Sequence, residues 1–539
     1  MFEGNACVDT ATRTDKDAGD VAQIARGAIF AVFQSTSAAA GPAGKQRLSM
    51  GIIVLEFNEL CPTLLGRWMA SGDLPNFKAL HDASQVFVTS ADAAPPALEP
   101  WIQWYSIHTG LSYSQHKVFH LTDGARAGHP DIWSIIQERG GRTGNFSSMN
   151  ARRQVEPGCF FMADPWCTAQ TAHPEQLQRF FEFVAQHVQE YANRDRPAGL
   201  SSAARLLASL TRQGLRFTTI GDIVTLLLRE FMQPTRIWQR AVVLDWLQTD
   251  LFLALYRKFN PAFATFFLNS TAHFQHAYWR HMEPEAFDTR PSITEFENYE
   301  HAIKFGYQNM DRLVQKFTRG KADGDVLMLV TGLSQQPFVK YEAVGGQRFY
   351  RPRDITEVLR MLGLRATVVE PVMTHQYMVR FASAGERDDA RSKLLDLVCE
   401  GRQVFEIEPC DSAALYLGCQ LHRQLAVDTA MTSASGRIGS RAFFDVFYQI
   451  DGIKSGCHHP DGALWIATGT PQVHAEKVSI LDIFPTWLEM LGIDYKPSAV
   501  HPFIGGSLVE RWAGEPAGLT QTARNQRRQA IEAGARPSI

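Results

Sequence analysis

The sequence predicts an α/β fold in which a mostly parallel β-sheet lies between layers of helices, as a three-layer α/β/α sandwich. Residues 51–55 form a short, unbroken, β-branched run (GIIVL), which is typical of a strand buried on both faces of a parallel sheet. Four similar runs follow at 85–89, 264–268, 326–330 and 464–467, and helical patterns separate them. Such alternation favours parallel pairing, because each crossover places a helix on a face of the sheet.

Other segments interrupt or flank this pattern. The first strand leads into a predicted helix over 62–69 that ends before Gly72. Residues 174–258 show only helical spacing of apolar residues, which indicates a helical insertion or cap. The stretch 366–420 reads as a small α+β insertion, and its elements are a strand at 373–381, a helix at 384–399, and strands at 404–408 and 413–417.

The predicted boundaries follow from these segments. The α/β core takes 50–173, 259–365 and 421–512, while 1–49 is expected to be a disordered extension and 513–539 a loose C-terminal tail.

Composition narrows the class of protein. The chain has 539 residues, of which 45% are hydrophobic and 20% charged, as in soluble globular proteins. Its 53 Lys and Arg against 56 Asp and Glu give a net charge of -3, which excludes the basic footprint of a nucleic-acid binder. The eight cysteines show neither a C-x-x-C pair nor zinc-finger spacing, and no run is long and apolar enough to span a membrane. We therefore expect a cytoplasmic protein with reduced thiols, no membrane span and no nucleic-acid partner.

Four short segments share an order along the chain with signatures of one enzyme family. The first is LEFNELCP at 55–62 with GDLPNF at 72–77, which fits a strand end followed by G-x-x-P-N-x-x-x-L. The second is PWIQW at 100–104 with Thr109, Gly110 and His116, which fits a helix ending in T-G-x-x-P-x-x-H, except that Tyr113 takes the place of the proline.

The other two segments lie further along the chain. AHFQHAYWR at 272–280 fits the pattern D-h-x-q-H-x-x-W-R, and GCHHPDG at 456–462 with DIFPT at 482–486 fits G-x-H-x-P-x-G and D-I-x-P-T. Together the four segments resemble the alkaline phosphatase superfamily, in particular its nucleotide pyrophosphatase and phosphodiesterase branch. The resemblance implies an alkaline phosphatase-like α/β/α fold.

In that family two metal ions flank a phosphate group and align a hydroxyl nucleophile, so the resemblance also implies roles for single residues. It places two ligands of one metal at His276 and His458. The carboxylate partner expected four residues before His276 is replaced by Ala272. The carboxylate at the end of the first strand falls on Asn58, with Glu56 two residues earlier on the same strand face.

Further positions depart from the family pattern. The Asp-His pair expected after the strand at 326–330 falls on Gly332 and Leu333, and the nucleophile position falls within residues 98–100, which contain no hydroxyl. These replacements remove more of the second metal site than of the first. The residues left therefore predict one divalent ion, zinc or manganese, on His276 and His458, with His273 and Glu56 or Glu99 as replacement ligands.

Three candidate catalytic residues remain, each with a structural alternative. Glu99 takes the nucleophile position as a ligand, a general base or a covalent nucleophile, or it is simply a carboxylate at a helix start. Glu56 ends a buried strand, where a carboxylate needs a partner or a ligand. Asn58 fits either the site or a turn, and His273 fits either a ligand or a helix face.

Two functions from different classes follow. The first is a metal-assisted hydrolase, or transferase, acting on a phosphate ester, a phosphodiester or a related small anionic ester. The second is a catalytically inactive protein with the same fold that binds an anionic ligand or a partner protein, as the replaced ligands and nucleophile would suggest.

Overall fold

A computed structural model describes residues 51–154, 156–189, 200–372, 375–410, 412–450 and 452–512. The predicted N-terminal extension and C-terminal tail lie outside these residues. Within them a nine-stranded sheet forms the centre of the molecule, in the order β20-β2-β19-β6-β1-β5-β3-β4, with β21 paired to β2. Its strands are β1 (Ile52–Phe57), β2 (Gln85–Ser90), β3 (Thr143–Phe146), β4 (Phe160–Met162), β5 (Phe263–Leu268), β6 (Val326–Val330), β19 (Asp461–Ile466), β20 (Gln472–Val473) and β21 (Val478–Ser479).

The sheet is mostly parallel, as predicted. Only β19 runs antiparallel to its neighbours β2 and β6, whereas the other described pairs of this sheet are parallel. All five predicted strands are present, because residues buried on both faces leave a continuous apolar run in the sequence. At the centre, β1 pairs with β5 and β6, so the residues that follow these three strands meet at one edge.

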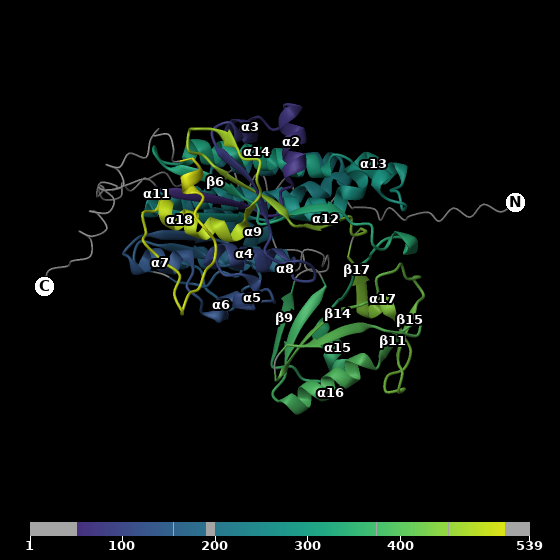
Figure 1. Cartoon of the computed structure of the whole chain (residues 1–539). Helices are drawn as coiled ribbons and strands as arrows, with labels where there is room; N and C mark the ends of the chain where they lie inside the picture. Colours follow the sequence, from purple (N-terminus) through teal and green to yellow (C-terminus); the bar gives the residue numbers. More distant parts are fainter. Residues whose placement is uncertain are drawn as a thin grey trace.

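Helices cover both faces of the sheet, which confirms the sandwich (Figure 1). Alternate residues of β5 point to opposite faces. Phe263 and Phe267 contact Trp487 of α18 (Ile483–Met490) and Trp104 of α4 (Pro100–Thr109). On the other face, Phe266 lies 5.0 Å, ring centre to ring centre, from both Phe252 of α11 (Ala241–Phe259) and Phe317 of α14 (Ala302–Gly320).

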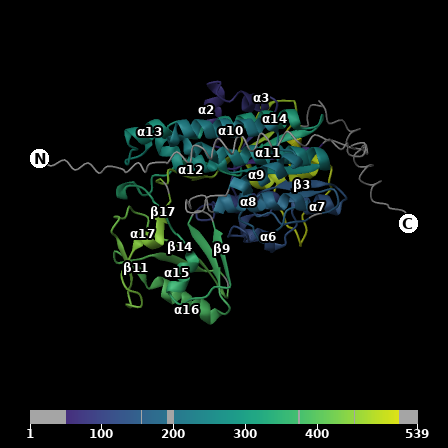
Figure 2. The ribbon, with the colours of Figure 1, turned by 180° about the vertical axis from the view of Figure 1, so that it is seen from behind.

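The segment predicted to be wholly helical consists, in its described residues, of helices joined by short turns. It contains α8 (Gln178–Gln189), α9 (Leu200–Gln213), α10 (Phe217–Met232), the 3-10 helix η2 (Pro234–Arg240) and α11. Its buried residues, among them Leu210, Leu226 and Val242, share one hydrophobic core with the sheet. These helices therefore add to the layer on the face seen in Figure 2.

A smaller module lies beside the main body, below it in Figure 1. Two four-stranded antiparallel sheets, β13-β14-β10-β9 and β12-β11-β15-β16, pack with its helices around a separate hydrophobic core. That core extends from Tyr350 to Phe447, beyond both ends of the predicted α+β insertion. The elements are β9 (Val368–Val372), β10 (Gln376–Arg380), β11 (Leu397–Cys399), β12 (Arg402–Gln403), β13 (Phe405–Pro409), β14 (Ala414–Cys419), β15 (Ala430–Ser433), β16 (Arg441–Ala442), α15 (Ile355–Met361), α16 (Ala384–Leu395) and α17 (Phe443–Val446).

The remaining elements connect these parts. Two short sheets pair β7 (Ser334–Pro337) with β18 (Gly456–His459) and β8 (Tyr350–Pro352) with β17 (Phe447–Gln449). The other helices are α2 (Pro62–Ala70), α3 (Pro75–His81), α5 (Tyr113–His116), α6 (Gly124–Ala127), α7 (Ile132–Glu138), α12 (Ser270–Met282) and α13 (Ile293–Tyr299). Across the described residues, none of the helices has the length and apolar character needed to cross a bilayer.

Candidate metal centre

Three side chains converge at the edge of the sheet where β1, β5 and β6 end. Glu59, His276 and His458 each direct a potential ligand atom to one point, with these atoms within 4.8 Å of one another. Oε2 of Glu59 lies 3.3 Å from Nε2 of His276 and 3.7 Å from Nε2 of His458. Glu59 is buried, whereas the side chains of His276 and His458 are 31% and 16% exposed, so the cluster is open to a ligand from solvent.

Glu59 has an unusual backbone conformation two residues after the end of β1. Its φ is 61°, in the left-handed region that a residue with a side chain rarely adopts. Its N–H donates to the carbonyl of Thr331 after β6, and its own carbonyl accepts from Nε2 of Gln275 over 2.8 Å. Gln275 is fixed in turn by the hydroxyl of Tyr307. Strain held by several neighbours in this way is typical of a functional position.

The carboxylate of Glu59 accepts two further hydrogen bonds. Nδ2 of Asn58 donates to Oε1 over 2.8 Å, and Nε2 of Gln335 donates to Oε2. Burial raises the pKa of Glu59, whereas the protonated rings of His458 and His276 and the hydrogen bond from Gln335 lower it, to about 2 on balance. A metal ion beside Glu59 would favour its anion in the same way when both rings are neutral.

His276 has a fixed tautomer. It lies on α12, which follows β5, and its Nδ1–H donates to the carbonyl of Gly456 over 2.9 Å. The backbone N–H of Ser455 donates back to the carbonyl of His276 over 2.7 Å. Because Nδ1 donates its proton to that carbonyl, Nε2, which lies 3.3 Å from Oε2 of Glu59, is the atom left to coordinate a metal ion between the two side chains.

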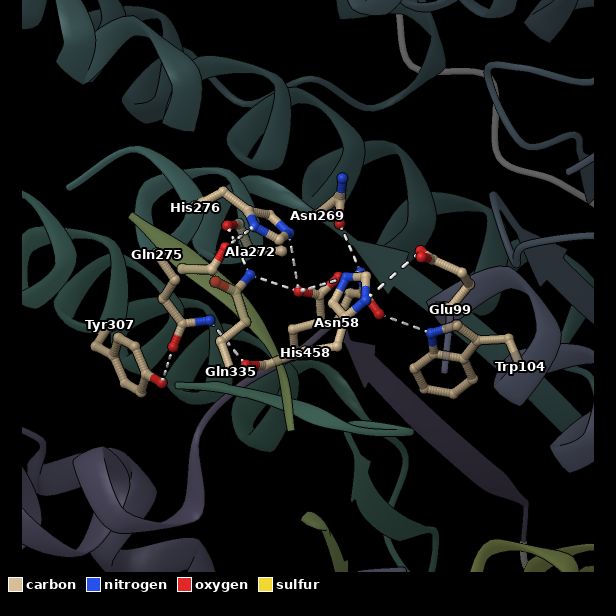
Figure 3. A network of polar contacts seen from close by, with 12 residues as sticks. Asn58, Glu99, Trp104, Asn269, Ala272, Gln275, His276, Tyr307, Gln335 and His458 are labelled. Atoms are coloured by element: carbon tan, nitrogen blue, oxygen red, sulfur yellow. Dashed lines mark hydrogen bonds and ion pairs between the residues drawn. The ribbon is translucent and has the colours of Figure 1, made fainter. Parts of the chain in front are cut away.

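His458 is the member of the cluster that lies beside Glu99 (Figure 3). It belongs to β18, opposite Gln335 of β7, and its ring centre is 5.4 Å from that of His276. Its Nδ1 lies 3.5 Å from Oε2 of Glu99. Burial lowers the pKa of His458 to about 4 although Glu59 opposes this effect, so the ring is neutral at pH 7, as a metal ligand must be.

Glu99 occupies the N-cap of α4, where Pro100 begins the helix. Its side chain makes no capping hydrogen bond and is directed toward His458 instead. Burial raises the pKa of Glu99 to about 8; Lys454 opposes this shift and Glu59 adds to it. A carboxyl group with such a pKa is suited to holding and releasing a proton near neutral pH.

The residues present fit one metal ion. Two imidazole nitrogens and one carboxylate oxygen form a donor set that proteins use for catalytic zinc, with further positions left for water and substrate. The positions expected to hold a second ion do not fit one. Asn58 uses Nδ2 for Glu59 and Asn269 and uses Oδ1 for Trp104. Gly332 and Leu333, where the other pair of ligands was expected, have no ligand atom in their side chains. Within the described ranges the cluster is the only group of three metal-ligating residues.

Two of the residues predicted for the site lie elsewhere. Glu56 is fully buried inside the sheet, where its Oε1 is 2.8 Å from Nε2 of His108 on α4, so its partner is a histidine of the core and not a metal. His273 lies on α12 one turn before His276, with its ring beside Phe274, and is not part of the three-residue cluster. The structure thus brings His276, His458, Glu99 and Asn58 together and places Glu56 and His273 outside the three-residue cluster.

Glu59 is the functional candidate that sequence reasoning missed. It was available as a second carboxylate after the strand, directly beside Asn58. Strand alternation pairs residues 56 and 58 on one face and excludes residue 59. Gln335 was missed as well, because nothing in its sequence neighbourhood marks it.

Comparison with known proteins finds similarity only to solved structures, and that similarity is distant. No family model matches the chain, and no curated protein matches it. Among solved structures it is similar to members of the alkaline phosphatase superfamily at low identity. These include phosphonoacetate hydrolase from Sinorhizobium meliloti in complex with phosphonoformate, which is 12% identical with a TM-score of 0.33 over 81% of this chain and 94% of that chain.

Two further matches are of the same kind. The human ectonucleotide pyrophosphatase/phosphodiesterase 5 is 10% identical, with a TM-score of 0.35 over 86% of this chain and 99% of that chain. The alkaline phosphatase PafA is 11% identical, with a TM-score of 0.41 over the same shares. At this level of similarity the activities of those proteins say nothing about the activity of this chain.

Proposed function

We propose that the chain is a metal-dependent hydrolase, or transferase, of phosphate esters, phosphodiesters or related small anionic esters. The observation that supports it is the cluster of Glu59, His276 and His458, in which Nε2 of His276 lies 3.3 Å from the carboxylate of Glu59. A divalent ion such as zinc or manganese bound there would lower the pKa of a bound water and draw electrons from a phosphoryl oxygen. The resemblance of the four sequence segments supports the substrate class.

Glu99 supplies the proton chemistry in this proposal. Its carboxyl group lies beside His458 at the N-terminus of α4, where the helix dipole favours a negative group. In its protonated form Oε2 donates a proton to the leaving oxygen of the ester, and the resulting carboxylate takes up a proton from solvent water before the next turnover. No hydroxyl nucleophile is required from the chain for this sequence.

Asn58, Gln335 and Gln275 position the cluster. Asn58 and Gln335 donate to the carboxylate of Glu59, and Gln275 donates to its backbone carbonyl. These contacts hold Glu59 in one orientation before any ion arrives, which reduces the reorganisation needed on binding.

Metal analysis of the full-length chain, purified without chelator, tests the proposal first. We expect close to one equivalent of a divalent transition metal in the wild type and a large loss in Glu59→Gln and His276→Ala. His273→Ala is the matched control, because it removes an imidazole from the same helix outside the cluster. Equal loss in His273→Ala would instead support His273 as a ligand.

A panel of aryl phosphate monoesters, diesters and phosphonates then tests the activity. Hydrolysis by the wild type that disappears with the metal would support the proposal. A wild type that binds no metal and hydrolyses none of these esters would overturn it in favour of the inactive, ligand-binding alternative, which the replacements at Ala272 and Gly332 would then explain.

A further inference from the structure

Lys454 lies on the segment that positions His276. The backbone N–H of Lys454 donates to the carbonyl of Gln347 over 2.9 Å. The next residue, Ser455, donates to the carbonyl of His276, and the one after it, Gly456, accepts from its imidazole. Lys454 is thus fixed in the same stretch of chain that leads into His458.

The ammonium group of Lys454 lies against aromatic rings. Its Nζ is 4.9 Å from the ring centre of Phe338 and 5.9 Å from that of Phe349. No ion pair joins it to a carboxylate in the part of the chain that the structure describes. Aromatic faces stabilise a cation without neutralising it, so the charge of this half-buried group remains available to a ligand.

The charge of Lys454 acts on groups of both the main body and the smaller module. On the side of the metal centre it lowers the pKa of Glu99 and of His458. On the side of the module it lowers the pKa of His375 and of His422.

Phe338, whose ring lies beside the Lys454 ammonium, directly follows β7. Because Gln335 of β7 donates to Glu59 and β7 pairs with the strand of His458, the ammonium and the cluster lie along the same short sheet, where one anion can contact both.

The two histidines of the module add hydrogen-bonding capacity beside Lys454. The ring of His375 is stacked on Phe349 with 4.7 Å between centres, and the ring of His422 lies 6.0 Å from Phe349. Nδ1 of each is buried and has no hydrogen-bond partner among the described residues. Lys454, His375 and His422 thus surround Phe349 with one positive charge and two unused polar atoms.

We infer that Lys454 binds an oxyanion of the substrate and selects anionic esters over uncharged ones. This inference rests on the proposed function, because it assumes that the ester is bound at the Glu59 cluster and adds Lys454 as a second group that contacts it. An ammonium is a compact point charge that pairs strongly with phosphoryl oxygens. Lys454 therefore determines specificity, because it favours ligands that carry a negative charge.

Binding of inorganic phosphate to the metal-loaded full chain tests the inference by titration calorimetry. We expect Lys454→Met to raise the Kd for phosphate by about tenfold or more, as the loss of a charge-assisted contact implies. Lys454→Arg should restore most of the affinity. Lys340→Met is the matched control, because Lys340 also lies over an aromatic ring, Tyr341, but faces neither Glu99 nor His458 in the interactions above.

Metal content and thermal unfolding are measured on every variant. Unchanged metal content with weaker phosphate binding in Lys454→Met alone supports the inference. It is overturned if Lys454→Met binds phosphate like the wild type, if Lys340→Met weakens binding equally, if the wild type binds no phosphate, or if Lys454→Met loses its metal.

The ester panel separates this inference from the proposed function. Phosphate binding that depends on Lys454, in a chain that hydrolyses no ester, would retain the anion site and reject the hydrolase. Hydrolysis of anionic and uncharged aryl esters with the same relative kcat/KM in the wild type and Lys454→Met would retain the hydrolase and reject the role of Lys454.

Discussion

Nε1 of Trp104 donates a hydrogen bond to Oδ1 of Asn58 over 2.8 Å, and this contact joins helix α4 to the residue beside Glu59. Asn58 in turn fixes its neighbours, because its Nδ2 donates hydrogen bonds to Glu59 and to Asn269. The helix that carries Glu99 at its start therefore also orients the carboxylate of the metal cluster.

Trp104→Phe tests this connection. The change leaves Oδ1 of Asn58 buried without its donor, so we expect a loss of about 1–3 kcal/mol in the free energy of unfolding and weaker metal binding. Urea unfolding and metal titration measure the two effects. Trp101→Phe is the control, since its indole donates to the Phe119 carbonyl away from the cluster and its loss should leave metal affinity unchanged. Equal metal affinity in both variants would contradict the connection.

Glu99→Gln separates proton transfer from metal binding. The amide keeps the size of the side chain but does not exchange a proton, so we expect kcat to fall by roughly 10²–10⁴ while the metal content stays at the wild-type value. Glu99 lies outside the three-residue cluster, which is why the metal should remain. A variant that loses its metal would show that Glu99 is a ligand instead.

Glu56→Leu tests the correction made for Glu56. The change leaves His108 buried without the carboxylate that faces its Nε2, and breaking a buried pair of this kind costs about 3–5 kcal/mol of stability. We expect this loss in urea unfolding with no change in metal content. Metal loss at unchanged stability would return Glu56 to the metal centre.

Asp245 should make stability depend on pH. Burial raises the pKa of this carboxyl to about 7, against the hydrogen bonds from Ser270 and Asn309. The folded chain therefore holds a proton that the unfolded chain releases near pH 4. Stability from this group is fully present below that pH and is lost as the pH rises to about 7, by up to about 4 kcal/mol.

Urea unfolding at pH 5, 6, 7 and 8 in the presence of chelator measures this effect. In Asp245→Asn the free energy of unfolding should depend less on pH. The variant should therefore become more stable relative to the wild type as the pH rises. The exposed Asp323→Asn serves as control. A wild type whose stability rose between pH 5 and pH 7 by as much as that of Asp245→Asn would refute the assignment.

Much of the fold could be predicted because its central strands are buried on both faces. The runs at β1, β5 and β6 contain only two polar residues, Glu56 and Thr265, and so remain recognisable. The two-residue strands β20 and β21 were not predictable, since their pairing depends on the edge of a sheet already formed. The extent of the smaller module was also hidden, because its core uses Tyr350 and Phe447, which lie outside its main sheet.

The metal centre could be predicted in part for a different reason. His276 and His458 stand within patterned segments that the resemblance identifies residue by residue. Glu59 does not, because its side chain reaches the cluster only after the chain turns at a φ of 61°. Glu56 and Asn58 were chosen because alternate residues of a strand lie on the same face, and the turn at Glu59 ends that alternation. A single left-handed residue therefore separates the expected carboxylate from the observed one.

The three ligands come from widely separated parts of the chain: the turn after β1, helix α12 and strand β18. An ion held by them would act as a cross-link that only the native topology can form, because the unfolded chain does not bring these segments together. At a free metal concentration a thousand times its Kd, such an ion would add about 4 kcal/mol to the unfolding free energy. Metal supply would then set how long the folded chain survives, apart from any reaction that it catalyses.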